Sequence, residues 1–338
     1  MRISPIFAPM KVNIRTLDLE ALKTWMVEHG EKPFRAKQVY EWLWKKSARD
    51  FEQMTSLSKA TRSLLSEHFS LPAVRISSSQ KSGDGTIKNA FRLHDEFLVE
   101  GVLIPTPKRM TACISSQVGC SLTCKFCATA RLKRERNIQA DEIYDQVALI
   151  MEQAEKNYKK PLTNIVYMGM GEPLLNYQNV LTSVEKITSP EGLGMSPSRI
   201  TVSTAGVAKM IKKLGDDKVR FRLALSLHAA NDAKRNEIMP INESNSLEAL
   251  AEALKHYHDQ TGNPVTYEYI IFDGFNDTIK DAHELYEFCQ HVPCKVNVIE
   301  YNPIDDGELQ QAKPEKTDAF ISYLEKKGIV VNVRRSRG

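Results

Sequence analysis

The chain has 338 residues, of which 42% are hydrophobic and 26% are charged. These fractions are ordinary for a globular protein, and they exclude a disordered chain, a collagen and a coiled coil. At about 150 residues per domain, the length allows one large domain or two ordinary ones. The formal net charge of +4 is too small to indicate a polyanionic partner by itself.

Membrane and secretory signals are not evident in the sequence. No run approaches the ~20 apolar residues that a transmembrane helix needs. The opening segment Met1–Pro9 is interrupted by proline and is too short for a signal peptide. We therefore expect a cytoplasmic protein with no membrane partner, whose cysteines stay reduced.

The first 82 residues predict a helical unit. Apolar residues recur every three or four positions over 17–28, 35–46 and 58–69. The stretch 30–40 mixes basic and aromatic residues, which suits an RNA-contacting surface as well as the plain outer face of a small helical bundle. A turn-rich segment at 77–85 marks a boundary. We place an N-terminal helical RNA-binding accessory domain at 1–82.

Residues 83–109 predict a short β-meander linker, with strands at 90–93 and 97–99. From Met110 strands alternate with helices. The expected strands are 110–115, 164–168, 199–203, 222–226, 266–272 and 295–300, and the expected helices include 140–156, 207–214, 247–260 and 279–291. This alternation predicts a parallel sheet with right-handed crossovers. Six units are too few for an eight-stranded barrel, so we predict an α/β fold with an open (β/α)6 partial barrel over 110–338 and an additional strand at 329–333.

The cysteines are concentrated in one place. Four of the six lie between Cys113 and Cys127, and three of them, Cys120, Cys124 and Cys127, have the spacing C-x3-C-x2-C. A structural zinc ion normally takes four ligands, often as two pairs, and no second pair is present. Three thiolates on one loop suit an iron–sulfur cluster that keeps one iron open for another ligand.

Small and polar residues follow most of the predicted strands. These segments are the cysteine loop at 120–127, Gly169–Asn176, Ser203–Gly206, Ser226–His228 and Tyr301–Pro303. Chemistry in such barrels sits at the carboxyl ends of the strands, and glycine there allows a close approach of the backbone to a ligand. The sequence therefore predicts one site at this edge of the sheet.

The segment Met110–Asn137, with Phe126 before the last cysteine of the motif, resembles the RlmN/Cfr family of radical S-adenosylmethionine (SAM) methyltransferases. The resemblance extends from 30–44 to the end of the chain. It implies the radical-SAM partial barrel and a [4Fe–4S] cluster held by Cys120, Cys124 and Cys127, whose open iron chelates SAM. The residues that match the SAM contacts of the family are Gly171, Glu172, Ser203, Ser226, Leu227, His228 and Asn302. We expect His228 to contribute its backbone and not to act as a base.

The resemblance also implies a mechanism. Carbon C2 of adenine is not nucleophilic, so a radical route in which the cofactor carries the difficult step is needed. In the family, one SAM methylates a cysteine of a C-terminal tail, and a second SAM supplies the radical that activates that methyl group. Glu100 matches the proton acceptor, although the residue alone would equally be a surface glutamate. Cys113 matches the cysteine that resolves the protein–RNA adduct through a transient disulfide bond.

The end of the sequence departs from the family pattern. The methyl-accepting tail cysteine of the family would follow Gly338. Cys289 falls within a predicted helix and Cys294 precedes a predicted strand, so neither is a plausible substitute. We expect a truncated chain that binds and cleaves SAM but leaves RNA unmethylated.

The segment Gly171–Asn176 favours an enzyme that methylates C2 of adenine 2503 in 23S rRNA and of adenine 37 in tRNA, using two SAM molecules per turnover. The alternatives are a C8-methylating antibiotic-resistance homologue and a non-catalytic, cluster-bearing RNA-binding protein. The expected partners are 23S rRNA, tRNA and a one-electron reductant such as flavodoxin or ferredoxin, and we expect a monomer.

Overall fold

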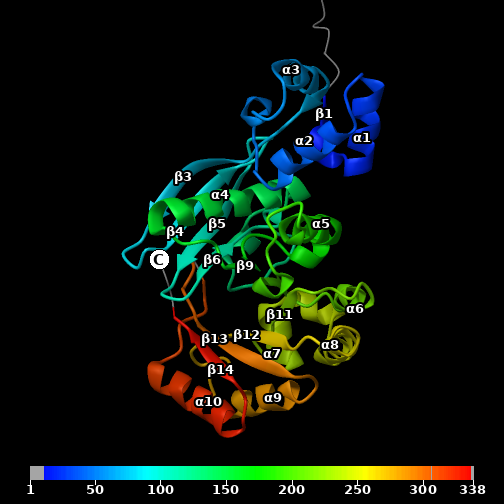
Figure 1. Ribbon diagram of the computed structural model, residues 1–338. Coiled ribbons are helices and arrows are strands. Elements are labelled where there is room, and N and C mark those ends of the chain that lie inside the picture. The colour runs from blue at the N-terminus through cyan, green and yellow to red at the C-terminus, as the bar shows by residue number, and fades with distance from the viewer. Residues whose placement is uncertain (1–10, 306, 336–338) are drawn as a thin grey trace, which may run out of the picture.

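The computed structural model describes residues 11–305 and 307–335. The opening segment and the last three residues, on which two of the expectations above depend, lie outside this part. Figure 1 shows the N-terminal helices at one end of the molecule, with the strands and their flanking helices forming the rest. No helix of the described chain is both long enough and apolar enough to cross a membrane.

Three helices form the N-terminal unit, as the periodicity predicts. They are α1 (Leu19–Glu28), α2 (Phe34–Trp44) and α3 (Lys59–His68). Asp18 and Ser58 begin α1 and α3, because their side chains accept hydrogen bonds from backbone N–H groups in the first turn. A two-stranded parallel pair, β1 (Val12–Asn13) and β2 (Phe69–Ser70), ties the start of this unit to its end.

A single ten-stranded sheet, in the order β14-β13-β12-β11-β10-β9-β6-β5-β4-β3, organises most of the chain. The antiparallel part comprises β3 (Arg75–Lys81), β4 (Ile87–Arg92), β5 (Leu98–Pro105) and β6 (Met110–Cys113). The parallel part continues from β6 through β9 (Asn164–Tyr167), β10 (Ile200–Thr204), β11 (Arg222–Ser226), β12 (Val265–Ile271), β13 (Cys294–Glu300) and β14 (Val331–Arg334). The edges β3 and β14 remain unpaired with each other, which confirms the open partial barrel.

The β-meander is continuous with the barrel sheet. β5 pairs directly with β6, and β3 already begins at Arg75, within the segment expected to be helical. Alternate residues of β4, including Ile87 and Phe91, are buried, while Lys88 between them is exposed. A meander with one covered face can extend the edge of a sheet in this way.

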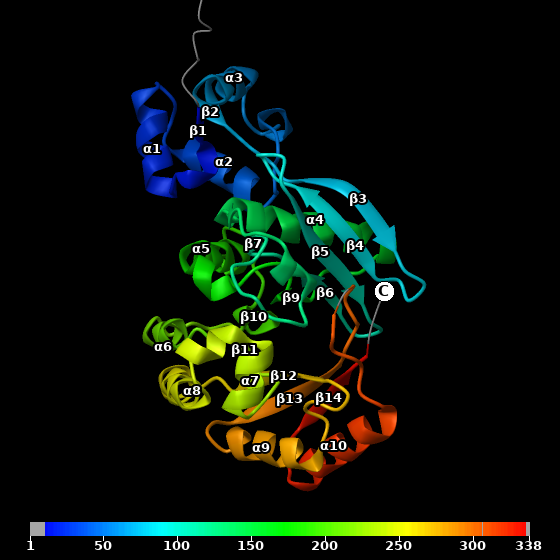
Figure 2. The same ribbon diagram turned by 180° about the vertical axis from the view of Figure 1, so that it is seen from behind.

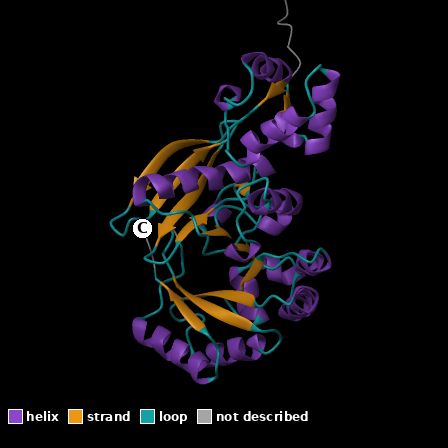
Figure 3. Ribbon diagram, in the orientation of Figure 1, coloured by secondary structure: helices purple, strands orange, loops and turns teal. Residues whose placement is uncertain are grey.

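The crossover helices lie on the outer side of the strands, as Figures 2 and 3 show. They are α4 (Ala140–Tyr158), α5 (Tyr177–Thr188), α6 (Ala208–Asp216), α7 (Asp232–Ile238), α8 (Leu247–Thr261), α9 (Ile279–Cys289) and α10 (Pro314–Lys326). The helices α5, α7 and α10 fall outside the ranges expected from the sequence. Because the helices cover the outer face, the inner face of the curved sheet is left to the site.

A buried ion pair joins the helical N-terminal unit to the barrel. Arg15 Nη1 lies 2.7 Å from Asp145 Oδ1 on α4, and both side chains are at most 1% exposed. Arg15 also donates to the carbonyl of Ala48, and the second carboxylate oxygen of Asp145 accepts from the backbone of Val74. One pair therefore connects four segments that are distant in sequence.

Replacing Arg15 by Met should destabilise the fold strongly, because the carboxylate of Asp145 would stay buried without its partner. We expect a loss of about 3–5 kcal/mol in the free energy of unfolding, measured by urea denaturation. The matched control is Lys23→Met at the exposed Lys23–Glu20 pair, where we expect less than about 1 kcal/mol. Equal effects of the two substitutions would contradict this assignment.

Candidate active site

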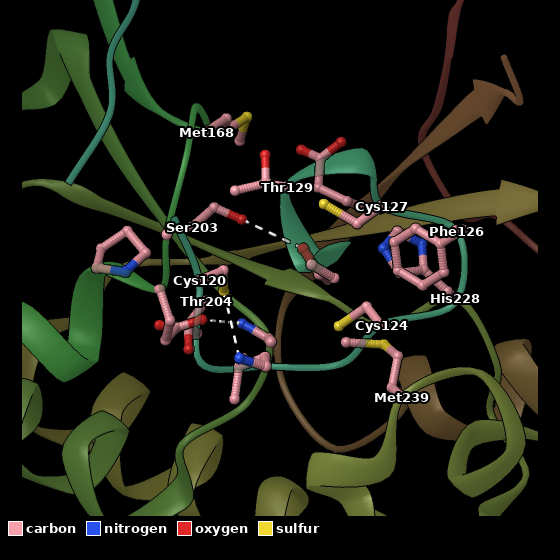
Figure 4. Close-up of a pocket in the computed structure, with 18 of the residues that line it drawn as sticks. Cys120, Cys124, Phe126, Cys127, Thr129, Met168, Ser203, Thr204, His228 and Met239 are labelled. Carbon is pink, nitrogen blue, oxygen red and sulfur yellow. Dashed lines mark hydrogen bonds between the residues drawn. The ribbon is translucent and has the colours of Figure 1, made fainter. Parts of the chain in front are cut away.

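A cavity of about 270 Å³ lies at the carboxyl ends of the barrel strands. Residues from the ends of β9, β10, β11, β12 and β13 line it, together with the cysteine loop that follows β6. Figure 4 shows Cys120, Cys124 and Cys127 with their sulfur atoms at this cavity, and Ser203 and His228 around it. The structure thus brings these residues together at the edge of the sheet that the sequence indicated.

The cysteine loop is closed at its base by a small antiparallel pair, β7 (Gln117–Val118) and β8 (Arg136–Asn137). Gly119 begins the loop with φ of +75°, and a Cβ atom there would lie 2.1 Å from the carbonyl oxygen of Lys133. Only glycine fits this close approach. On its far side the loop is attached to α7, because the N–H of Lys125 donates to the carbonyl of Ile238 at 3.0 Å.

The chemistry of the three thiols suits an iron–sulfur cluster. Cys120, Cys124 and Cys127 form an all-sulfur donor set at one cavity. A structural zinc ion normally takes four protein ligands. Three thiolates instead fit an iron–sulfur cluster in which one iron has no protein ligand.

Two of the three thiols, those of Cys120 and Cys124, favour the protonated form in the absence of metal. Burial raises the pKa of Cys124 to about 12, and the nearby charges of Cys127 and Cys120 raise it further. Burial also raises the pKa of Cys120. Since thiolates are the ligands, binding of iron at these residues must release protons.

Glu172 is a carboxylate held inside the cavity wall. It is 3% exposed, and its two oxygens accept backbone N–H groups of Leu174 at 2.9 Å and of Ala205 at 2.7 Å. Burial raises the pKa of this carboxyl group, which these hydrogen bonds counteract. A carboxylate oxygen has capacity for a further donor, so Glu172 can also bind a cationic group in the cavity.

Gly171 makes this placement of Glu172 possible. Its φ is +92°, and a Cβ atom would lie 2.4 Å from Cβ of Gln117. The side chain of Gln117 in turn accepts the N–H of Glu172 at 2.9 Å. The backbone of the loop is therefore packed directly against β7.

The remaining expected contacts differ in their access to the cavity. The hydroxyls of Ser203 and Ser226 lie 3.4 Å apart on its wall. Leu227 is fully buried and does not line the cavity, while Asn302 is exposed just beyond β13 and lies outside its lining. Ser203 and Ser226 are therefore positioned to contact a ligand in the cavity, whereas Asn302 would have to move toward it.

His228 is unsuited to act as a base. Burial, together with the nearby charge of Arg235, lowers its pKa to about 3. Its Nδ1 accepts the N–H of Ile270 at 3.1 Å, and its ring meets the ring of Phe126 edge to face at 4.6 Å. The neutral imidazole therefore supports the cysteine loop, in agreement with the expectation that it is not a base.

Glu100 and Cys113 lie beside the cavity and not in its lining. Cys113 pairs with Val102, two residues after Glu100 on β5, so both side chains point to the same face of the sheet. The carboxylate of Glu100 forms an ion pair with Lys88 at 2.7 Å. Cys113 is half-buried, and burial raises its pKa to about 11.

A serine connects these residues to the glycine loop. The hydroxyl of Ser115 donates to the carbonyl of Glu100 at 2.6 Å and accepts the N–H of Met170 at 2.8 Å. The sulfur of Met170 in turn accepts the N–H of Glu100 at 3.3 Å. Ser115 is fully buried, so these bonds are shielded from water.

Sequence reasoning missed Arg235. This fully buried residue of α7 donates to the carbonyls of Ala205 at 2.6 Å, Ser226 at 3.2 Å and Leu227 at 3.1 Å. It thereby holds the ends of β10 and β11 together beneath the cavity, and its charge lowers the pKa of Cys124 against the effect of burial. No local motif marks an arginine with this role.

The group His94, Asp95 and Glu142 is already neutralised by a cation. The guanidinium of Arg136 lies 2.5 Å from Asp95 and 2.7 Å from Glu142. Because this positive charge occupies the centre of the group, the residues fasten β8 to the β4–β5 turn and α4 instead of forming a metal site.

Comparison with known proteins agrees with this geometry. Residues 114–289 match the radical SAM superfamily, and residues 12–71 match the ribosomal RNA large subunit methyltransferase N-terminal domain. The fold and the cysteine loop thus define a radical SAM protein, a class that implies SAM and an iron–sulfur cluster.

Similar proteins narrow the assignment. A protein of Cytophaga hutchinsonii named "Probable dual-specificity RNA methyltransferase RlmN" is 63% identical over 96% of this chain and 89% of its own length. A protein of Christiangramia forsetii with the same name is 57% identical over 97% of this chain and 93% of its own. The crystal structure of a radical SAM methyltransferase from Sphaerobacter thermophilus superposes with a TM-score of 0.91 at 36% identity, over 97% of this chain and 96% of that one. The chain belongs to the RlmN family.

Replacing Gly171 by Ala should displace the glycine loop, because the added methyl would overlap Gln117. We expect a loss of about 3 kcal/mol or more in unfolding free energy, measured by chemical denaturation. The control is Gly194→Ala, where φ is also positive at +66° but no atom lies within 4 Å of the added Cβ. That variant should lose only about 1 kcal/mol, and a similar loss at both positions would show that backbone strain alone is responsible.

Proposed function

We propose that this protein is a cytoplasmic radical-SAM methyltransferase that methylates C2 of adenine 2503 in 23S rRNA and of adenine 37 in tRNA. The observation that carries the proposal is the shared cavity of the three cysteines and the buried carboxylate of Glu172. Membership of the RlmN family supports the RNA substrates. The regiochemistry rests on the Gly171–Asn176 segment, which has the sequence expected of the C2 enzyme.

Two cofactors fit the residues present. Cys120, Cys124 and Cys127 would hold three irons of a [4Fe–4S] cluster, and Glu172 with the backbone of Gly171 would bind the amino group of SAM. Bound together, these groups supply the radical that the unreactive carbon requires. Ser203 and Ser226 would contact SAM through their hydroxyls, while Leu227, His228 and Asn302 complete the proposed set of contacts. We propose two SAM molecules per turnover and a methyl-cysteine intermediate.

Two side chains of this protein, on the same face of the sheet, would take part directly in the reaction. Glu100 would accept the proton that leaves the adenine, and its ion pair with Lys88 holds the carboxylate in place on β5. Cys113 would then release the RNA by attacking the sulfur of the tail cysteine that carries the methyl carbon: a disulfide bond forms, the carbon–sulfur bond breaks, and its electron pair moves to the adenine base. The raised pKa of Cys113 means that the thiol must lose its proton to a nearby base before it can attack.

The N-terminal unit is suited to contact RNA. Phe34 is 53% exposed, and the guanidinium of Arg35 lies over its ring at 5.0 Å. Lys46 similarly lies over the ring of Trp42 at 4.1 Å. Aromatic rings beside cations can stack bases while neutralising phosphates. We propose residues 1–82 as the RNA-binding accessory part, joined by 83–109 to a monomeric catalytic barrel that takes electrons from flavodoxin or ferredoxin.

Removing one cysteine of the motif should abolish the cluster. Anaerobically reconstituted protein should bind about four irons, whereas Cys124→Ala should lose the cluster absorbance and the ability to cleave SAM to 5′-deoxyadenosine. The control is Cys294→Ala, which lies at the opposite end of the barrel and should keep both. SAM cleavage by Cys124→Ala would overturn the ligand assignment.

The product identifies the function. Reduced protein extended beyond Gly338 by a family-like tail with the methyl-accepting cysteine, incubated with SAM and a 23S rRNA fragment or tRNA, should yield 2-methyladenosine in the nuclease digest analysed by mass spectrometry. Cys113→Ala should instead accumulate a covalent protein–RNA adduct, visible on a denaturing gel. Finding 8-methyladenosine would support the C8 homologue, and SAM cleavage with neither product nor adduct would contradict an RNA methyltransferase.

A further inference from the structure

The strand register shows which side chains point to the inner face of the sheet below the cavity. Side chains alternate along a strand, and partners in neighbouring strands point the same way. Ser203, Ser226, Glu268 and Ile299 line the cavity. The residues two or four positions before them on the same strands therefore face inward as well. They are Thr201, Arg222, Thr266, Asn297 and Lys295.

This inner face is polar where a barrel interior is usually apolar. Barrel interiors are filled mainly by Val, Ile and Leu. Here those residue types point outward instead, as with the fully buried Val202, Leu223 and Val296. Apart from Thr266 and Asn297, which are buried, the inward-facing residues of this group are half-buried or exposed. The lower interior is therefore an accessible surface and not a packed core.

Four cations gather on this surface. Lys295 is half-buried, and Arg222, Arg334 and Arg109 lie close enough for their charges to lower its pKa, in addition to the larger effect of burial. We call Arg109, Arg222, Lys295 and Arg334 the basic floor. Arg222 begins β11 and Arg109 directly precedes β6. Arg334 instead ends β14, where it pairs with the cavity-lining Ile299, so it lies at the upper limit of this surface.

The protein does not neutralise the basic floor. None of the four cations forms an ion pair within the described part of the chain. The nearby charge of Glu268 acts in the opposite direction and raises the pKa of Lys295. Its own carboxylate is buried and accepts a hydrogen bond from Asn297 at 2.7 Å. Like charges without a counter-ion favour an anion from outside, and here one of them, Lys295, is half-buried while the three arginines are exposed.

The basic floor faces the same space as the residues proposed to act on RNA. A continuous run of partners crosses the sheet from Cys113 through Val166 and Thr201 to Arg222. Neighbouring strands lie about 4.8 Å apart, so Arg222 lies about 14 Å along the sheet from Cys113. The cations are spread over several strands, which suits successive phosphates of one chain better than a single free anion.

We propose that the basic floor binds phosphate groups of the RNA strand whose adenine is presented to Cys113 and Glu100. This inference rests on the proposed function, since it assumes an RNA substrate. It adds a specific path for that substrate, along the inner face of the barrel beneath the SAM cavity and distinct from the surface of the N-terminal helices.

The test measures RNA affinity without SAM or reductant, using reconstituted full-length protein and transcribed tRNA in filter binding over a series of salt concentrations. Lys295→Met and Arg222→Met keep apolar stems of similar length and remove one charge each. Each should weaken binding about tenfold and lower the magnitude of the log–log salt slope by about 1. Lys295→Arg should restore both. The control Lys255→Met removes an exposed charge from α8 and should change neither.

Several outcomes would overturn the proposal. If Lys295→Met and Arg222→Met match Lys255→Met in affinity and salt slope, the cations do not contact RNA. If SAM affinity falls while RNA affinity is unchanged, the floor serves the cofactor. If inorganic phosphate binds the wild type but not the variants, and RNA affinity is equal in all of them, the site takes free anions only. Failure of the wild-type protein itself to bind tRNA would instead count against the proposed function.

Discussion

The arrangement of the site depends on one constraint, the continuous parallel pairing from β6 to β14. Because each strand runs in the same direction, all of their carboxyl ends meet at one edge, and each crossover helix must lie on the outer face. The cysteine loop, the Gly171–Glu172 turn and the hydroxyls of Ser203 and Ser226 come from positions up to about a hundred residues apart. The direction of pairing alone brings them to one cavity.

At the ends of parallel strands, some backbone N–H and C=O groups have no hydrogen-bond partner in the segment that follows. In this site, buried charged side chains are the hydrogen-bond partners of such groups. The carboxylate of Glu172 accepts two N–H groups, while the guanidinium of Arg235 donates to three carbonyls. Each residue thus has a structural role at the same edge where a ligand would bind. The negative charge faces the glycine loop and the positive charge lies beneath the cysteines, so the cavity is electrostatically polarised across its width.

The sequence predicted those features that are carried by local pattern. Three features could be predicted because each depends on neighbours in the chain. They are the cysteine spacing, the glycines after strand β9 and the alternation of strands with helices. Strand β3 could not be predicted from the sequence, because nearly all of its side chains are exposed and its apolar residues do not alternate with polar ones. Arg235 could not be predicted either, because the carbonyls that hold it come from β10 and β11 and exist only in the folded chain. Leu227 and Asn302 were expected from resemblance alone, and the structure leaves both outside the cavity lining.

Ser115 is bonded on one side to the strand that carries Glu100 and on the other to the loop that precedes Gly171. A single hydroxyl cannot follow two backbones that move apart, so displacement of either segment must break one of its bonds or pull the other segment with it. The strand that carries Glu100 and the loop that carries Gly171 are therefore coupled through one hydroxyl group. A displacement of β5 would be transmitted to the wall of the cavity, although Glu100 itself does not line it.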